Sequence, residues 1–387
     1  MISWLFWNPD RVAFTLPGLG HPIAWYGLLF ASGMFLGYQI LFFIISRWFL
    51  LVPKIFISEV ADSSLFCTRL ATLFPAFCVR LPLHMQRALR EGNLQKSAME
   101  HCLSELNRWL LETEEKGSVL PKGVRRFAKR WLTDQQTYAL SRRLQLEEKI
   151  GKALGSLRQR ARLFCDRLSF YLLLGIVVGA RLGHFLFYED WLGNLSCFSH
   201  LFHVWEGGLA SHGGIVGLII AGLLFCRRYS KDYPWISLIH LLDLLALPAL
   251  CSAAFIRIGN FVNQEVLGTA TTAPWAIVFG NPVDGSAAIP RHPAQLYEAL
   301  FYAASFFVAS GFFPRRLFRP GQVSGATFVF IFVFRFLIEF IKCHQSAWLG
   351  QFPFTMGQLL SVPVIAYGVW LLIKNKPLSL GVMKQSA

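Results

Sequence analysis

The sequence has few charged residues, and fewer of them are acidic than basic. Only 15% of the 387 residues are Asp, Glu, Lys or Arg, whereas 54% are hydrophobic and 15% are aromatic. This composition excludes an ordinary water-soluble globular protein and predicts that the chain lies in a lipid bilayer. The net charge of +15 would suit a nucleic-acid-binding protein, but the basic residues are scattered among loops and no nucleic-acid-binding module organises them. We therefore expect no nucleic-acid partner.

The sequence also lacks the cysteine spacings of metal sites. It has eight cysteines, but no CxxC and no Cys/His spacing typical of zinc. Several cysteines fall inside apolar segments, where a free thiol packs as a small hydrophobic group. We expect no structural disulfide, no metal and no cofactor.

A cleavable signal peptide is another feature that is missing. The first apolar segment begins late and follows several aromatic residues, rather than a basic region before a small-residue cleavage site. We expect this segment to remain as a helix.

Seven segments are long and apolar enough to cross a hydrocarbon core of about 30 Å, which takes roughly 20 residues. The predicted fold class is therefore an all-α integral membrane protein with about seven transmembrane helices. In the second segment, glycines spaced four apart in "GIVVGARLG" predict close packing of another helix. The expected spans lie at about 24–50, 169–190, 209–226, 234–256, 293–313, 322–342 and 357–374.

Basic residues follow alternate spans and predict the topology, because basic loops are retained on the cytoplasmic side. The basic block between the first two spans falls on the same side. The amino terminus is therefore expected outside and the carboxyl terminus in the cytoplasm. The residues are Arg227, Arg228 and Lys231 after the third span, Arg315, Arg316 and Arg319 after the fifth, and Lys374 and Lys376 after the seventh.

The chain is expected to have three parts: 1–52 with the first span, 53–168 as a basic cytoplasmic insertion, and 169–387 as the rest of the membrane core. From Arg80 to Arg167 there are 19 Lys or Arg and 10 Asp or Glu. Two stretches within 53–168 have the apolar spacing of amphipathic helices. These helices could rest on anionic headgroups or form a solvated hairpin. The stretches are 99–116 and 142–164, and the apolar segment 65–83 reads as an interfacial or buried helix, with an eighth span as the alternative.

Polar side chains inside membrane spans are costly, so each of them is a candidate functional residue. The predicted topology brings polar groups from four spans to the outer leaflet. These groups are Tyr26 on the first span, His212 on the third, Arg257, Asn260, Asn263 and Glu265 at the end of the fourth, and Arg335 and Glu339 on the sixth.

Arg257 and Arg335 are two fixed cations at the expected depth of the outer headgroups. Guanidinium groups suit a phosphodiester better than an ammonium does, so the pair suggests an anionic phospholipid. Two simpler interpretations stay open. Arg335 and Glu339 are four residues apart and could form an intrahelical ion pair, and Arg257 could extend its head group to the interface without a specific role.

Two further polar residues allow more than one interpretation. His212 is flanked by Gly213 and Gly214, which leaves room for a substrate, and histidine accepts a proton near neutral pH. Taken alone, a histidine at a span end is more often a packing residue. Asp243, in the middle of the fourth span, is either a structural partner for an arginine such as Arg181 or a participant in chemistry.

Four stretches resemble the signature blocks of bacterial prolipoprotein diacylglyceryl transferases, in the family's order. They are "WEGGLASHGGIVG" (Trp205 to Gly217), "RIGNFVNQEVLG" (Arg257 to Gly268), "RHPAQLYEAL" (Arg291 to Leu300) and "FRFLIEF" (Phe334 to Phe340). The resemblance covers the chain except roughly 53–168. It implies transfer of the diacylglyceryl group of phosphatidylglycerol to the lipobox cysteine of a prolipoprotein, with release of glycerol phosphate, by a multi-pass enzyme of the bacterial cytoplasmic (inner) membrane.

The resemblance also implies roles for particular residues. The reaction needs a thiolate and a stabilised phosphate leaving group. Arg257 and Arg335 would hold the phosphate, and Asn260 and Tyr26 would position the substrate. The functional positions carried over are Tyr26, His212, Arg257, Asn260, Glu265, Gly268, Arg335 and Glu339.

The general base is left open by the sequence. His212 would act as base or as headgroup ligand, and Glu265 or a water could take the proton instead.

Two departures from the family pattern are present. Ile331 stands where the family usually has a tyrosine, one turn before Arg335, and 53–168 replaces a much shorter connection.

Two other classes of function compete with an enzyme. A lipid or solute transporter would also have polar groups within its spans, but these should line a path to both faces with a site at the midplane. The predicted cluster lies at one side only. A non-catalytic scaffold that recruits a partner through its basic insertion would leave the outer cluster unexplained.

Overall fold

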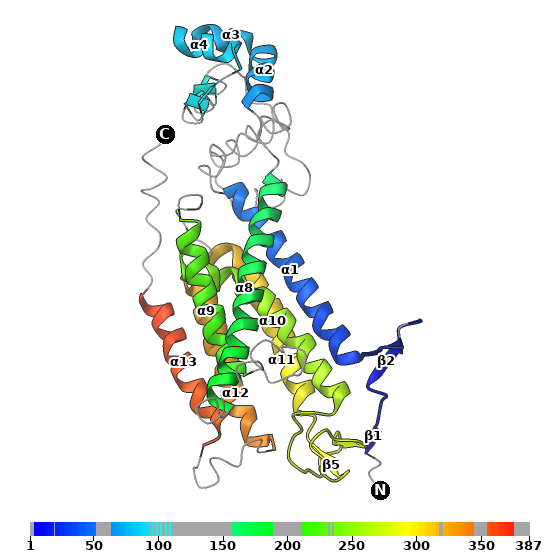
Figure 1. The fold of residues 1–387 in the computed structure, drawn as a ribbon. Coiled ribbons are helices and arrows are strands. Elements are labelled where there is room, and N and C mark those ends of the chain that lie inside the picture. The colour runs from blue at the N-terminus through cyan, green and yellow to red at the C-terminus, as the bar shows by residue number, and fades with distance from the viewer. Residues whose placement is uncertain are drawn as a thin grey trace. The chain divides into compact units, whose positions relative to one another are not determined.

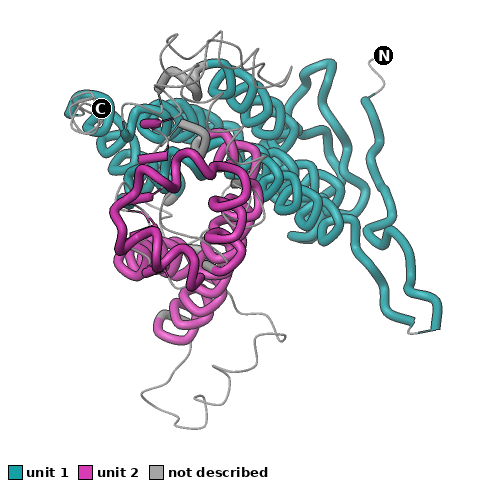
Figure 2. The backbone as a smooth tube through the Cα atoms, turned by 90° about the horizontal axis from the view of Figure 1, so that it is seen from above, with its two compact units in different colours: residues 1–41, 237–387 teal, residues 42–236 magenta. Residues whose placement is uncertain are grey.

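The computed structural model forms two compact units (Figure 2), residues 1–41 with 237–387 and residues 42–236. Each unit is described separately. The residues that the structure describes are 4–18, 20–51, 63–92, 157–188, 210–230, 236–316, 320–343 and 354–374, with residue 233 and short pieces between 94 and 109.

Helices occupy all seven of the ranges expected to cross the membrane (Figure 1). Among the described residues, α1, α8, α10, α12 and α13 are long and apolar enough to span a bilayer, so the chain is a multi-pass membrane protein. That α9 and α11 also cross stays a prediction, as does the topology. The helices are α1 (Trp25–Leu51), α8 (Leu157–Tyr188), α9 (Ser211–Arg228), α10 (Leu238–Asn263), α11 (Ala294–Arg316), α12 (Gln322–Ile338) and α13 (Met356–Lys374), and a short 3₁₀ helix, η4 (Glu339–Ile341), follows α12.

Small residues let α1 approach α10 in the first unit. A Cβ atom added at Gly33 would lie 2.8 Å from Phe255 Cβ, and one added at Gly37 would lie 2.9 Å from Ser252 Oγ. The Ser252 hydroxyl donates a hydrogen bond of 2.9 Å to the Gly33 carbonyl oxygen. Tyr26 is seven residues before Gly33, which is two helical turns, so it lies on the same face of α1 and faces the end of α10.

The structure is mostly helical, but it also contains short strands that the predicted all-α class did not include. β1 pairs in parallel with β4, which pairs in antiparallel with β5, and β2 pairs with β3 in a separate hairpin. Trp7 of β1 stacks on Phe261 of α10 with ring centroids 4.7 Å apart, and Phe279 of β4 packs on the same ring. The three-stranded sheet thus fixes the end of α10. The strands are β1 (Leu5–Trp7), β2 (Val12–Thr15), β3 (Pro22–Ala24), β4 (Ile277–Phe279) and β5 (Pro290–Arg291).

The second unit contains the antiparallel pair α8 and α9, whose backbones touch. A Cβ atom added at Gly179 would lie 2.7 Å from Gly217 Cα, and one added at Gly183 would lie 2.7 Å from Gly213 Cα. Only glycine leaves room for this approach, so the prediction that these glycines pack helices is confirmed. α8 begins at Leu157 rather than near residue 169, and residues 110–156 lie outside the described part of the chain.

Three short helices form a small core in the second unit. They are interrupted at Phe74 and again before Pro82. The longest has 11 residues and rises about 16 Å, which is too short for a bilayer, so the alternative of an eighth span is wrong. Phe66 and Leu70 are fully buried. The helices are α2 (Ser63–Leu73), α3 (Pro75–Arg80) and α4 (Leu83–Arg90).

Candidate active site

The C-terminal turns of α10 hold the first arginine of the site. Arg257 and Asn260 are three residues apart and therefore lie on one face of the helix. An Nη atom of Arg257 donates a hydrogen bond of 3.2 Å to Asn260 Oδ1. The side chain of Arg257 is only 17% exposed and its Nε lies 3.0 Å from a carboxylate oxygen of Glu298. Arg257 is therefore held by a carboxylate of the protein and does not extend freely to its surface, while its role stays a prediction.

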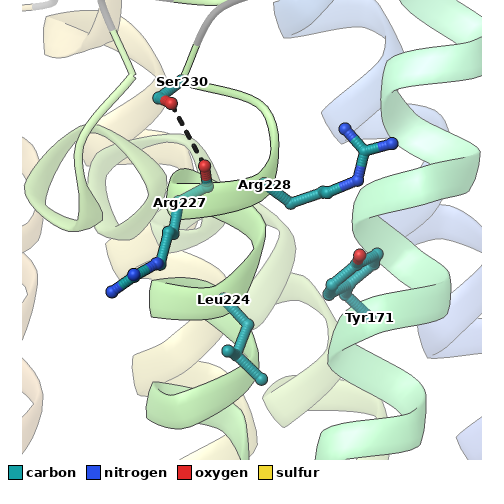
Figure 3. A pocket seen from close by; sticks show the side chains of 5 residues that line it. All are labelled: Tyr171, Leu224, Arg227, Arg228 and Ser230. Atoms are coloured by element: carbon teal, nitrogen blue, oxygen red, sulfur yellow. Dashed lines mark hydrogen bonds between the residues drawn. The ribbon is translucent and has the colours of Figure 1, made fainter.

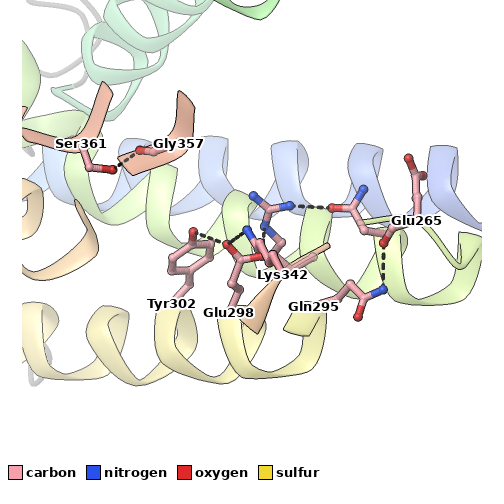
Figure 4. A network of polar contacts seen from close by, with 9 residues as sticks. Glu265, Gln295, Glu298, Tyr302, Lys342, Gly357 and Ser361 are labelled. Atoms are coloured by element: carbon pink, nitrogen blue, oxygen red, sulfur yellow. Dashed lines mark hydrogen bonds and ion pairs between the residues drawn. The ribbon is translucent and has the colours of Figure 1, made fainter. Parts of the chain in front are cut away.

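Glu298 is the centre of the polar cluster (Figure 4). This α11 residue is fully buried, and it forms ion pairs with Arg257 (3.0 Å) and with Lys342 (2.8 Å). The contact with Arg257 is an ion pair at an angle outside hydrogen-bond geometry, whereas Lys342 Nζ donates a hydrogen bond. The Tyr302 hydroxyl reaches the same carboxylate at 3.5 Å. One buried carboxylate thus holds two cations from different segments.

Neither Glu298 nor Lys342 was among the residues predicted from the sequence. A signal for Glu298 was nevertheless present, because it is an acidic residue inside an apolar helix, where ionisable groups are rare and usually functional. Lys342 gave less indication, since it is a single basic residue after the end of α12.

Arg335 and Glu339 do not form the intrahelical ion pair that their spacing allowed. Arg335 makes no ion pair with any carboxylate in the part of the chain that the structure describes. The guanidinium groups of Arg335 and Arg257 both lie within electrostatic range of the Tyr302 hydroxyl. The Glu339 carboxylate lies against the start of α13, where a Cβ atom added at Gly357 would lie 2.6 Å from Glu339 Cδ.

The segment after α10 brings Glu265 to the cluster. α10 ends at Asn263, and Gln264 adopts the left-handed conformation with φ of 58°. Val266 also has a positive φ, 59°, which is costly for a β-branched residue and typical of functional loops. The Asn263 amide donates a hydrogen bond of 2.9 Å to a Glu265 carboxylate oxygen, and Gln295 Nε2 donates one of 2.8 Å to the Glu265 main-chain oxygen.

Tyr26 reaches the same cluster from α1. A Cβ atom added at Gly259 would lie 2.9 Å from Tyr26 Cδ2, so the ring lies directly against the α10 backbone. The Tyr26 hydroxyl is within electrostatic range of Glu265 and Arg257. Of the predicted site residues, the structure therefore brings Tyr26, Arg257, Asn260, Glu265, Arg335 and Glu339 together in the first unit.

Gly268 is the point where three segments meet beside the cluster. It pairs with Lys342 as an isolated β-bridge, and a Cβ atom added there would lie 2.7 Å from His292 Cβ and would overlap the His292 carbonyl oxygen. Its own carbonyl oxygen accepts a hydrogen bond of 3.1 Å from the Cys343 thiol. Gly268 thus positions Lys342, which pairs with Glu298, through close backbone contact.

Two other residues were singled out in the sequence. His212 is in the first turn of α9, in the second unit, and its side chain is outside the described part, so its role stays a prediction. Asp243 is a structural residue with a different partner from the one suggested. Its carboxylate accepts hydrogen bonds from the Gly321 N–H (2.6 Å), the Ser324 N–H (2.7 Å) and the Ser324 hydroxyl (2.8 Å), and so caps the start of α12.

The charges of the cluster are unevenly paired. Three cations, Arg257, Arg335 and Lys342, face the carboxylates of Glu298, Glu265 and Glu339, but Glu298 alone takes two of the cations. Arg335 therefore keeps a guanidinium fork without a carboxylate partner among the described residues. No group of His, Cys, Asp and Glu that could hold a metal ion is found in the described ranges.

Comparison with known proteins gives concordant matches. The family model of prolipoprotein diacylglyceryl transferase matches residues 143–374. The phosphatidylglycerol–prolipoprotein diacylglyceryl transferase of Protochlamydia amoebophila is 37% identical over 378 residues, which are 97% of this chain and 96% of that protein. The match therefore includes most of 53–168.

Two other relatives with the same name each match about half of this chain. The protein of Chlamydia caviae is 40% identical over 221 residues, 54% of this chain and 73% of that protein. The protein of Porphyromonas gingivalis is 40% identical over 223 residues, 54% of this chain and 76% of that protein. This chain belongs to the prolipoprotein diacylglyceryl transferase family.

Proposed function

We infer that this chain catalyses the reaction for which its relatives are named, the transfer of a diacylglyceryl group from phosphatidylglycerol to a prolipoprotein. In this reaction the sulfur of the lipobox cysteine forms a bond to the terminal glycerol carbon of the diacylglyceryl group. The bond from that carbon to the phosphate oxygen breaks, and glycerol phosphate leaves with the electron pair. The thiol proton passes to a base.

The observation that carries the assignment of roles is a pair of arginines within range of one hydroxyl, of which only Arg257 has a carboxylate partner among the described residues. We propose that the phosphate of the lipid lies between Arg257 and Arg335. Glu298 fixes the Nε edge of Arg257, and Asn260 fixes one of its Nη atoms. Arg335, which has no carboxylate partner in the described ranges, presents a guanidinium group that a phosphodiester can bind through two hydrogen bonds. Cations already in place where charge develops on the leaving phosphate lower the barrier without reorganisation.

For the base, Glu265 is the candidate that the geometry supports best among the described side chains. Its carboxylate accepts a hydrogen bond from a neutral amide, Asn263, and makes no ion pair with a cation in the described part of the chain, so it keeps its capacity to accept a proton. His212 remains the second candidate, as base or as headgroup ligand, and a water is the third.

Tyr26 and Asn260 are proposed to position the substrate. The missing tyrosine at Ile331 does not leave the cluster without a hydroxyl, because Tyr302 of α11 points at Glu298 and lies within electrostatic range of both arginines. We propose that Tyr302 contributes to orienting the phosphate from this direction.

The cellular setting is proposed from the charge pattern and the family. The amino terminus lies outside, the carboxyl terminus lies in the cytoplasm, and the enzyme works in the inner membrane on phosphatidylglycerol and on lipobox signal peptides. Segment 53–168 is a cytoplasmic insertion, so a deletion within it that ends before α8 begins at Leu157 should leave transferase activity. A complete loss in a folded variant would contradict this proposal.

The test uses detergent-purified protein mixed with phosphatidylglycerol and a lipobox peptide. Mass spectrometry should show a diacylglyceryl adduct on the peptide cysteine, and the adduct should disappear in Arg257→Ala. Arg162→Ala, in α8 of the second unit, is the matched control and should retain the adduct. Absence of an adduct with folded wild-type protein would refute the transferase assignment, and equal activity of Arg257→Ala would refute the phosphate site.

A further inference from the structure

One end of the α8–α9 pair is strongly basic. The antiparallel register of the glycine contacts continues to this end, where Tyr171 of α8 meets Phe225 of α9 with ring centroids 5.6 Å apart. One turn further, the Arg167 guanidinium lies 5.4 Å from the ring centroid of Tyr229. The first turns of α8 and the last turn of α9 therefore lie side by side. Their arginines are Arg158, Arg160, Arg162, Arg167, Arg227 and Arg228, and Asp166 is the one acidic residue on the two helices.

An open pocket of about 580 Å³ lies at this basic end (Figure 3). Arg228 extends towards α8 above Tyr171, Arg227 extends away from it, and Leu224 lies one turn below. The Ser230 hydroxyl donates a hydrogen bond of 3.1 Å to the Arg227 carbonyl oxygen and closes the turn. No carboxylate in the described part of the chain forms an ion pair with Arg227 or Arg228.

The surface next to the pocket is apolar. Leu224 is 53% exposed and Ile220, one turn further from the arginines, is 51% exposed. On α8, Leu174 is 52% exposed, in the turn after Tyr171. Two arginines without carboxylate partners in the described part of the chain, beside exposed apolar side chains on both helices, match an amphiphile with an anionic head. A soluble phosphate or a nucleic acid would leave these apolar side chains unused.

We propose that this pocket binds the phosphate of an anionic phospholipid, with the acyl chains along the exposed apolar faces of α8 and α9. Basic pockets between membrane helices are suited to anionic headgroups. Arg227 and Arg228 provide the positive charge, and the Tyr171 ring and Leu224 contact the glycerol and the first methylenes of the lipid. The site is distinct from the substrate phosphate site proposed above, because none of its residues belongs to that cluster.

The experiment titrates the purified full-length protein in detergent with dioleoyl phosphatidic acid and counts bound lipids by native mass spectrometry. A basic residue near an anionic membrane surface contributes about 1 kcal/mol, so Arg227→Gln with Arg228→Gln should weaken binding about thirtyfold. Arg158→Gln with Arg162→Gln removes the same charge outside the pocket and should change binding less than threefold. Arg227→Lys with Arg228→Lys keeps the charge and should retain most of the affinity.

Transferase activity separates this site from the other one. The Arg227→Gln, Arg228→Gln variant should keep its activity at saturating phosphatidylglycerol and its melting temperature. Equal binding by this variant and wild type overturns the proposal, and so does an equal loss in the control pair, which would indicate diffuse charge. Displacement of the lipid by glycerol phosphate at equal concentration would also overturn it, because the site would then recognise the headgroup alone.

Discussion

Replacement of Glu298 by glutamine tests the buried network at its centre. The change keeps the volume of the side chain and removes the negative charge between Arg257 and Lys342, which lie 3.0 Å and 2.8 Å from the two carboxylate oxygens. Glutamine retains one oxygen and presents an amide donor to one of the two cations. Both cations then remain in a site where Lys342 is 6% exposed, with no carboxylate among the described residues in ion-pair contact with them.

The expected loss of stability is large. Removal of one partner from a buried ion pair costs about 3–5 kcal/mol, because the other charge stays buried and unpaired. Since Arg257 is partly accessible to water, we expect a value near the lower end, about 3 kcal/mol. For a compact unit of this size each kcal/mol lowers the melting temperature by about 2–4 °C. The melting temperature of Glu298→Gln should therefore fall by about 6–12 °C.

Catalysis should fall as well, because Glu298 orients the Nε edge of Arg257. The assay measures kcat and KM for diacylglyceryl transfer to a lipobox peptide, below the melting temperature of each variant. Glu298→Asp keeps the charge but draws the carboxylate back by one methylene, and a displacement of about 1 Å can cost about a hundredfold in rate. This variant should therefore lose kcat much more than stability. Lys342→Met added to Glu298→Gln removes the unpaired lysine and should restore part of the melting temperature.

The reasoning would be refuted by a Glu298→Gln variant that melts within 2 °C of wild type. Unchanged kcat in Glu298→Asp would refute the positioning role separately, since the ion pairs would then serve folding alone.

Three further predictions follow from the described contacts. Arg335→Lys keeps the charge but loses the two parallel N–H donors of the guanidinium group, so diacylglyceryl transfer should fall at least tenfold with an unchanged melting temperature. A lower melting temperature would indicate an ion pair that the described part of the structure does not have. Asp243→Ala removes the cap of α12 and should lower the free energy of unfolding by about 1–3 kcal/mol, and an unchanged thermal unfolding curve would contradict this role. Burial raises the pKa of the Cys102 thiol from 9.0 to about 11, so the folded state holds this proton more tightly than the unfolded state. The free energy of unfolding should therefore decline as pH rises from 9 to 11. A Cys102→Ala variant with the same decline over this interval would show that other groups cause it.

Much of the fold could be predicted from local patterns. Apolar run length identified the seven helical ranges, and glycine spacing predicted that another helix packs closely on α8, because both are properties of one segment and its period. The strands of three residues or fewer could not be predicted, since a segment so short has no recognisable alternation. β1 and β4 pair although they are far apart in the chain.

Only part of the site could be predicted, because contacts between separate helices leave no local pattern in the sequence. The polar residues at the end of α10 stand out against an apolar helix, whereas the pairing of Glu298 with Lys342 depends on the packing of separate helices. The expected Arg335–Glu339 ion pair did not form, although the Glu339 N–H still donates to the Arg335 carbonyl oxygen as in an α-helix. The Glu339 carboxylate lies against Gly357 of α13 instead, a contact between separate helices that sequence spacing does not reveal.

The backbone contact between α8 and α9 limits the routes by which a lipid can travel. Where two helices are separated by side chains, a change of rotamer can open a fenestration wide enough for an acyl chain. Between Gly179 and Gly217 there is no side chain to rotate, and the carbonyl of one helix touches the other helix directly. This seam is permanently shut unless whole helices separate, so neither the lipid donor nor the lipidated product can pass through it, and both must use another opening.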